Sequence, residues 1–301
     1  MKYSSWIIAV FILLVLSVGC SAPQQQDMHD KKLLIATTFF PLYDLTRSIL
    51  GNKGTAFALV PAGAEPHEYE ASPQDILQLN KADGFVTMGV AFSAFEDTLK
   101  SSVGPQVKII DAGLNVTLLP FVDAEKGNLG GLDSHIWLSP KNAKKMAANI
   151  LEGISSVDAE NARYYESNAQ ILFTQLDTLD AEFKEGLSAC KLHVVLVNHN
   201  AFSYLGKDYG FTTMYITGLE PEAEPSPSQL KEIVDQARKQ NIKYVLYEDL
   251  VDPRVAQTIA DEVHATVLAL SPLEGSSDPK DTYVSLMEKN LKTLRTALAC
   301  P

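Results

Sequence analysis

Short β-prone runs alternate with helical patterns along the first third of the chain. Apolar and β-branched residues concentrate in four runs, at residues 33–37, 56–60, 84–87 and 107–110. Helical patterns begin in the gaps between these runs, near Pro41, Pro73 and Ser93. Strands that alternate with helices in this way predict a parallel sheet whose faces are covered by the helices.

The pattern changes between Val157 and about Leu187, where no proline and no glycine before Gly186 interrupts it. Apolar residues recur there every three or four positions, at Tyr165, Ala169, Leu172, Leu176, Leu179 and Phe183. A single apolar stripe of this kind predicts one helix of about 30 residues, roughly 45 Å long. A helix of this length is suited to act as a rigid strut.

Strand–helix alternation then resumes towards the C-terminus. The β-prone runs span residues 192–197, 211–216, 242–247 and 266–270, Pro253 opens one of the intervening helices, and residues 281–298 form a closing helix. The whole pattern predicts two α/β lobes, each a parallel sheet flanked by helices, joined by one long rigid helix. We expect the N-terminal lobe at residues 32–155, the linking helix at 156–188 and the C-terminal lobe at 189–301.

The N-terminus has the features of an export signal. Lys2 precedes an uncharged, largely apolar run at residues 6–18, which is too short for a helix of the roughly 20 residues that span a bilayer. The Gly19-Cys20 pair that follows resembles a lipobox. We therefore expect a lipoprotein signal peptide at residues 1–20, a flexible polar tether at 21–31, and an extracytoplasmic protein anchored to the cell membrane by a lipid on Cys20. The alternative is an unmodified Cys20 in a discarded signal.

Two cysteines remain in the exported part of the chain, Cys190 and Cys300. Disulfides persist outside the cytoplasm, so we expect these two to form one. Such a bridge would attach the closing helix to the start of its own lobe. The alternatives are two free buried thiols or, less favoured, a zinc–thiolate site, since neither cysteine has a nearby residue of ligand type.

Composition narrows the range of functions. Hydrophobic residues make up 46% of the 301 positions, which is enough for two cores. The chain has 25 basic and 37 acidic residues, a formal charge of −12, and no basic patch. Nucleic acid is therefore not an expected partner.

Three histidines stand in separate segments, each close to a predicted strand end or a capped helix. His67 lies in VPAGAEPHEYEASP (60–73), His135 in LDSHIWLSP (132–140) and His199 in LVNHNAFSYLGKDYG (196–210). Ligands of open α/β sheets bind at the carboxyl edge of the strands, where we expect these side chains to lie. The other three histidines, His29, His193 and His264, are assigned no role.

These three segments resemble the signature segments of the solute-binding lipoproteins of zinc and manganese ABC importers. Those proteins carry a P-x-G-x-E-P-H-like loop, a D-x-H-I-W-L-x-P segment and an H-x-A-F-x-Y segment in the same order and at similar spacing. The resemblance runs from about residue 33 to the closing helix. It implies two lobes around a long helix, with the metal between them and His67, His135 and His199 as metal ligands.

The resemblance also bears on the metal and on the fourth ligand. Manganese-type members place a carboxylate where His199 stands, and imidazole nitrogen suits zinc, so we expect Zn²⁺. Many members have an aspartate after the last strand, but LSPLEGSS (270–277) has Ser271 there. Glu274 resembles the glutamate of zinc-type members similar to AdcA, and we expect it to be the fourth ligand. Glu65 and water are the alternatives.

The expected function is high-affinity capture of Zn²⁺ and its delivery to a cognate ABC permease driven by an ATPase. We expect a monomer that is not an enzyme. One alternative is the manganese- or iron-binding component of a similar importer. A second, of a different class, is a secreted zinc hydrolase, against which stands the absence of an HExxH motif.

Overall fold

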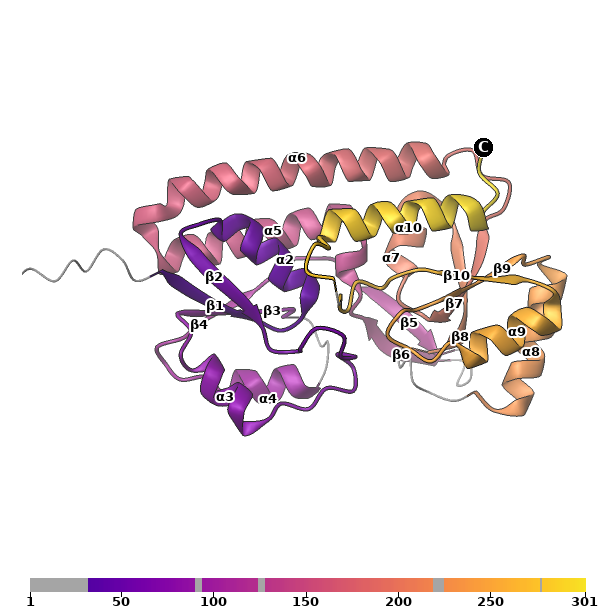
Figure 1. Ribbon diagram of the computed structural model, residues 1–301, viewed down its shortest axis with the longest axis horizontal. Helices are drawn as coiled ribbons and strands as arrows, with labels where there is room; N and C mark the ends of the chain where they lie inside the picture. Colours follow the sequence, from indigo (N-terminus) through magenta and orange to yellow (C-terminus); the bar gives the residue numbers. More distant parts are fainter. Residues whose placement is uncertain (1–31, 90–93, 124–127, 219–224, 277) are drawn as a thin grey trace, which may run out of the picture. The chain divides into compact units, whose positions relative to one another are not determined.

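The computed structural model describes residues 32–89, 94–123, 128–218, 225–276 and 278–301 (Figure 1). The expected signal peptide, the tether with His29, and Cys20, on which we expect the lipid, lie outside the described residues. None of the described helices is long and apolar enough to cross a bilayer. Residues 33–301 form one unit.

The first lobe is built on a four-stranded parallel sheet in the order β2-β1-β3-β4. Its strands are β1 (Leu33–Thr37), β2 (Gly54–Ala58), β3 (Gly84–Thr87) and β4 (Lys108–Asp111). Its helices are α2 (Phe40–Leu50), α3 (Pro73–Leu79), α4 (Ala94–Ser102) and α5 (Pro140–Val157). β1 and β3 coincide with the predicted runs. β2 begins two residues before the start of its run because Leu33 pairs with Gly54, and β4 begins one residue after the start of its run.

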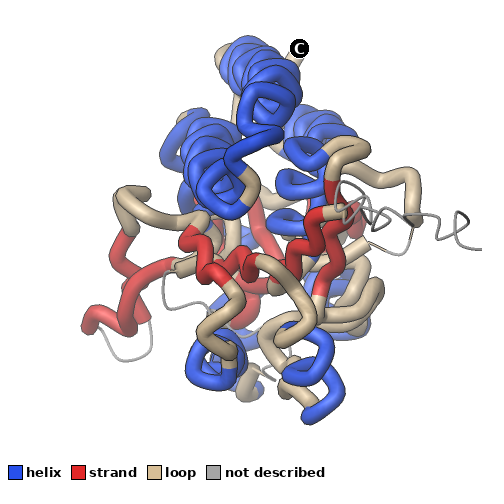
Figure 2. The backbone as a smooth tube through the Cα atoms, turned by 90° about the vertical axis from the view of Figure 1, so that its left-hand side faces the viewer, coloured by secondary structure: helices blue, strands red, loops and turns tan. Residues whose placement is uncertain are grey.

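A second four-stranded parallel sheet, in the order β10-β9-β7-β8, forms the other lobe. Its strands are β7 (Val194–His199), β8 (Thr212–Thr217), β9 (Tyr244–Tyr247) and β10 (Thr266–Ala269). Its helices are α7 (Ser203–Tyr209), α8 (Pro227–Lys239), α9 (Arg254–Val263) and α10 (Tyr283–Ala297). Strands lie between helical layers in Figure 2. The prediction of two α/β lobes with parallel sheets is confirmed.

An antiparallel hairpin, which the sequence pattern did not predict, follows the first sheet. It consists of β5 (Leu119–Asp123) and β6 (Asn128–Asp133), and the residues that join its strands lie outside the described part. Tyr204 of α7 fastens its base, because the phenol accepts a hydrogen bond from the Leu119 N–H (2.8 Å) and donates one to the Asp133 carbonyl (2.6 Å). The hairpin therefore packs on an element of the second lobe although it precedes the linking helix in sequence.

The long helix is α6 (Ala162–Leu187), and it runs alongside α5 and α10 (Figure 1). Every residue of the predicted apolar stripe is buried, from Tyr165 to Phe183. The helix has 26 residues rather than about 30, because α5 ends at Val157 and the 3-10 turn η3 (Ala159–Asn161) intervenes. At 1.5 Å per residue it is about 39 Å long, enough to line both lobes.

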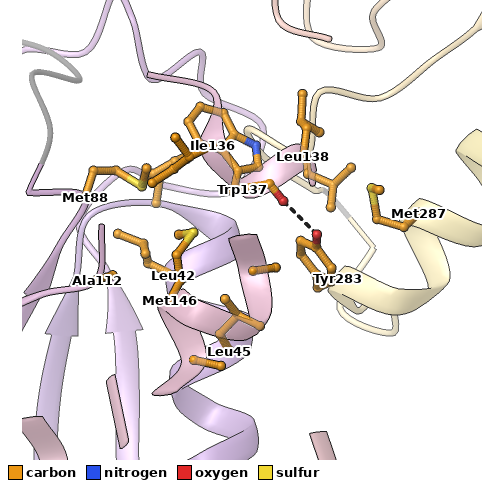
Figure 3. Close-up of a cluster of buried hydrophobic side chains, with 14 of the residues drawn as sticks. Leu42, Leu45, Met88, Ala112, Ile136, Trp137, Leu138, Met146, Tyr283 and Met287 are labelled. Carbon is orange, nitrogen blue, oxygen red and sulfur yellow. Dashed lines mark hydrogen bonds between the residues drawn. The ribbon is translucent and has the colours of Figure 1, made fainter. Parts of the chain in front are cut away.

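Cys190 and Cys300 form the expected disulfide, which attaches the C-terminus to the segment after α6. Apolar packing connects the two lobes. Figure 3 shows Trp137 and Tyr283 among Leu42, Met146 and Met287, with the Tyr283 hydroxyl donating to the Trp137 carbonyl at 2.6 Å. All five residues are fully buried, so side chains from both lobes share one core at this point.

Candidate metal centre

His67 lies in the irregular loop between β2 and α3. The Glu65 carboxylate accepts a hydrogen bond from the His67 backbone N–H (3.0 Å), and the Ala64 N–H donates to the Pro61 carbonyl (3.1 Å). These bonds join residues of the same loop, which prolines and Gly63 (φ 81°) keep out of regular structure. The side chain of His67 is only 6% exposed, so the loop turns it inward.

His135 follows β6 and precedes the 3-10 turn η2 (Ile136–Leu138). One carboxylate oxygen of Asp133 accepts two hydrogen bonds from it, from the backbone N–H (2.9 Å) and from ring Nδ1–H (2.8 Å). Because Nδ1 carries the proton, Nε2 has the free lone pair. Asp133 therefore fixes both the orientation and the tautomer of the ring, as the outer partners of metal-bound histidines do.

His199 is the last residue of β7, so its strand extends two residues beyond the predicted run. Glu248, directly after β9, repeats the arrangement seen at His135. Its carboxylate accepts from the His199 backbone N–H (3.1 Å) and from Nδ1–H (2.7 Å). Glu248 and Asp133 are both buried, and the Nε2 atoms of His135 and His199 face each other at 3.2 Å.

Glu274 completes the group from the turn that follows β10. One of its oxygens lies 3.1 Å from Nε2 of His67, 3.5 Å from Nε2 of His135 and 3.6 Å from Nε2 of His199. The four candidate ligand atoms all lie within 4.8 Å of one another. A tetrahedral zinc site with bonds near 2.0–2.1 Å has ligand–ligand edges of about 3.4 Å, so this spacing fits such a site.

Burial and charge act in opposite directions within the group. Burial raises the pKa of Glu274, but the neighbouring charges of His199 and His67 outweigh it and hold this pKa well below the usual value. Burial lowers the pKa of His199, yet the charges of Glu248 and Glu274 raise it well above 6.5. Without a metal, the site therefore favours a protonated His199 beside an ionised Glu274.

The remaining candidates are not members of this group of four. Glu65, the alternative fourth ligand, bonds the His67 amide instead, and burial followed by the charge of Glu274 raises its pKa to about 8. Ser271 donates its backbone N–H to Asn290 (2.9 Å). His193 is exposed before β7, and His264 ends α9 in the left-handed conformation (φ 56°).

Sequence reasoning did not identify Asp133 and Glu248 as partners of the histidines. A signal for Asp133 was present, because it stands two residues before His135 and its carboxylate can reach that residue's amide. Glu248 directly follows the predicted run 242–247, at the same carboxyl sheet edge as His199. Only the pairing of β7 with β9 brings it beside that histidine.

A two-lobed α/β fold with a buried ligand set where the lobes meet is typical of solute-binding proteins. The chain belongs to the family described as zinc-uptake complex component A, periplasmic, whose model matches residues 35–297. The expected family is therefore confirmed.

Relatives from several bacteria are similar over most of the chain. The zinc-binding lipoprotein AdcA of Streptococcus pneumoniae is 34% identical over 308 residues, covering 98% of this chain but 61% of AdcA. This chain thus spans about three-fifths of that relative's length. The high-affinity zinc uptake system protein ZnuA of Bacillus subtilis is 31% identical, with 97% and 96% covered.

Among solved structures, the Zn(II)-bound ZnuA-like domain of Streptococcus pneumoniae AdcA has a TM-score of 0.78 at 33% identity. The match covers 89% of this chain and 99% of that domain. The laminin-binding protein Lmb of Streptococcus agalactiae, described as a bifunctional protein with adhesin and metal-transporting activity, has a TM-score of 0.81 at 30% identity, with 89% and 100% covered.

Proposed function

We propose that this protein captures Zn²⁺ outside the cytoplasm and delivers it to the permease of an ABC importer. The observation that carries the proposal is the buried set of three imidazole nitrogens and one carboxylate oxygen. The Glu274 oxygen lies 3.1–3.6 Å from the three Nε2 atoms, and those of His135 and His199 are 3.2 Å apart. The zinc-binding and zinc-uptake functions in the names of the relatives support the same cargo.

The proposed ligands are Nε2 of His67, His135 and His199 and a carboxylate oxygen of Glu274. Three imidazoles and one carboxylate suit zinc, whereas manganese and other hard cations prefer a set richer in oxygen. This preference ranks zinc above the manganese or iron alternative. A hydrolase needs an open position for a reactive water, and four protein ligands leave none in a tetrahedral site.

Hydrogen bonds within the site prepare two of the histidines to bind Zn²⁺. Asp133 and Glu248 hold the Nδ1 protons of His135 and His199, so that Nε2 of each ring points at the incoming cation. The cation displaces the proton that His199 carries in the metal-free site. Glu274, which is ionised and buried, then offsets part of the positive charge.

The cellular setting of the proposal rests on the family and on the N-terminal sequence. The family description places its members in the periplasm, and AdcA is described as a lipoprotein. We infer an extracytoplasmic protein held at the membrane by a lipid on Cys20, acting as a monomer. Its partners are a cognate permease and the ATPase that drives it.

A competition titration of metal-free protein against a chromophoric zinc chelator tests the proposal. Zinc should bind more tightly than manganese. Loss of a residue that only orients a ligand typically lowers metal affinity about 10–100-fold, and His67→Ala should lower zinc affinity by more than this. His193→Ala, at an exposed histidine, should leave zinc affinity unchanged. Tighter binding of manganese, or equal effects of the two substitutions, would contradict the assignment. Hydrolytic activity in the zinc-loaded protein would favour the enzyme alternative.

A further inference from the structure

The turn that carries Glu274 is held in a conformation that it would not adopt alone. It spans residues 270–274 after β10, and Leu273 within it is fully buried with φ 59°. The left-handed region is unfavourable for a bulky residue, so such a backbone persists only where its surroundings hold it. Inside the turn, the Leu273 N–H donates to the Ser271 hydroxyl at 3.1 Å.

Asn290 of α10 supplies one external hold. Its Oδ1 accepts from the Ser271 N–H (2.9 Å) and its Nδ2 donates to the Ser271 carbonyl (2.7 Å). Asn290 is 2% exposed and lies on the buried face of α10 between Met287 and Leu294. A buried amide costs free energy unless its groups are bonded, and here one side chain satisfies both main-chain groups of Ser271.

Trp137 supplies the second hold, at the next residue of the turn. Its indole N–H donates to the Pro272 carbonyl at 2.7 Å, and both partners are buried. Trp137 lies two residues after His135, and its own carbonyl accepts from Tyr283 of α10 (Figure 3). The turn is therefore attached to α10 on one side and to the His135 segment on the other.

We propose that Asn290 is a positioning residue for the cargo. By fixing Ser271, it holds the Glu274 carboxylate beside the three histidines before the metal arrives. The metal is then taken with four protein ligands instead of three histidines and a water. This inference rests on the proposed zinc-binding function and adds to it the residue that prepares the fourth ligand.

The test compares Asn290→Leu, Glu274→Gln and the double variant. Leucine fills a similar volume but leaves the Ser271 N–H and carbonyl without their partner. We expect zinc affinity to fall about 10–100-fold, as it does when an outer partner of a metal ligand is lost. In the Glu274→Gln background the same substitution should cause little further loss, because Asn290 acts through Glu274.

Cobalt(II) alone serves as the spectroscopic probe. Four-coordinate cobalt absorbs much more strongly in the visible region than five- or six-coordinate cobalt. The spectrum of Asn290→Leu should move from that of the wild type towards that of Glu274→Gln. Leu294→Ala, on the same buried face of α10, is the matched control, which should lower the melting temperature and leave the spectrum unchanged.

An unchanged zinc affinity in Asn290→Leu, or an equal loss in the Glu274→Gln background, would overturn the inference while zinc binding stands. Wild-type affinity in Glu274→Gln would overturn it as well. Absence of zinc binding in the wild type would instead remove the proposed function. If Asn290→Leu does not fold, Asn290→Ser removes the same pair of bonds with a smaller polar side chain, and the same outcomes apply.

Discussion

The affinity for zinc should depend steeply on pH above neutrality, because the surroundings of His199 raise its pKa in the metal-free site. Burial alone would lower the pKa of His199, but the charges of Glu248 and Glu274 raise it well above 6.5. The pKa of His135 is also raised, since its bonds to Asp133 and Glu274 outweigh burial. Zinc must displace the proton of His199 to reach its Nε2.

The raised pKa of His199 enlarges this pH dependence. Three ordinary histidines with a pKa of about 6.5 would weaken binding only about twofold between pH 8.0 and 7.0. One histidine that stays protonated across this interval weakens it about tenfold, or 1.4 kcal/mol. Burial and the charge of Glu274 raise the pKa of Glu65 to about 8. Because a bound cation favours its ionised form, Glu65 releases a further proton in this interval, which makes the pH dependence of zinc affinity steeper.

Isothermal titration calorimetry in buffers of different ionisation enthalpy measures the effect. We expect release of about one proton or more per zinc at pH 7.5, together with the steep change in affinity. Glu248→Gln removes the first of the charges that raise the pKa of His199, so it should reduce both. A change of twofold or less in the wild type over this interval would refute the reasoning.

The same pKa shifts predict different pH trends for the stability of the metal-free and the zinc-loaded protein. A group whose pKa is raised on folding contributes stability below its unfolded pKa, near 6.5 for His199, and loses it as pH rises through the folded value. Glu274, whose pKa is lowered, contributes above about 4.5 and loses this contribution as pH falls further. The melting temperature of metal-free protein should therefore fall as pH rises above neutrality, whereas that of the zinc-loaded protein should not.

Three further predictions concern other parts of the molecule. Replacing Cys190 and Cys300 by serine opens a loop of 110 residues and should cost up to about 4.8 kcal/mol in chemical denaturation, with metal affinity kept; a loss below about 1 kcal/mol would contradict the entropic account. Leu176→Ala on the buried stripe of α6 should cost about 2–5 kcal/mol, measured in the same way. Asp133→Asn should lower the affinity for zinc about 10–100-fold in a competition titration. An unchanged affinity would show that Asp133 does not orient His135 for the metal.

The amino-acid pattern alone was sufficient for the fold class. Alternation of apolar runs with helical stripes predicted the parallel sheets, because strand and helix periods are local properties of the chain. The apolar stripe of α6 is buried as predicted. The β5–β6 hairpin was missed because its strands contain proline and glycine, and because its base is stabilised by Tyr204 from a distant helix.

The sequence by itself also determined the residue types of the candidate site, since each histidine could be identified from its own short segment of the chain. Only the tertiary structure decided that Glu274 lies beside the three histidines and that Glu65 turns to the His67 amide. It likewise decided that Asp133 and Glu248 orient two of the rings and that Asn290 and Trp137 hold the turn. The physical reason is distance along the chain. Glu274 and His67 are 207 residues apart, so their contact depends on how two lobes pack and not on any local preference.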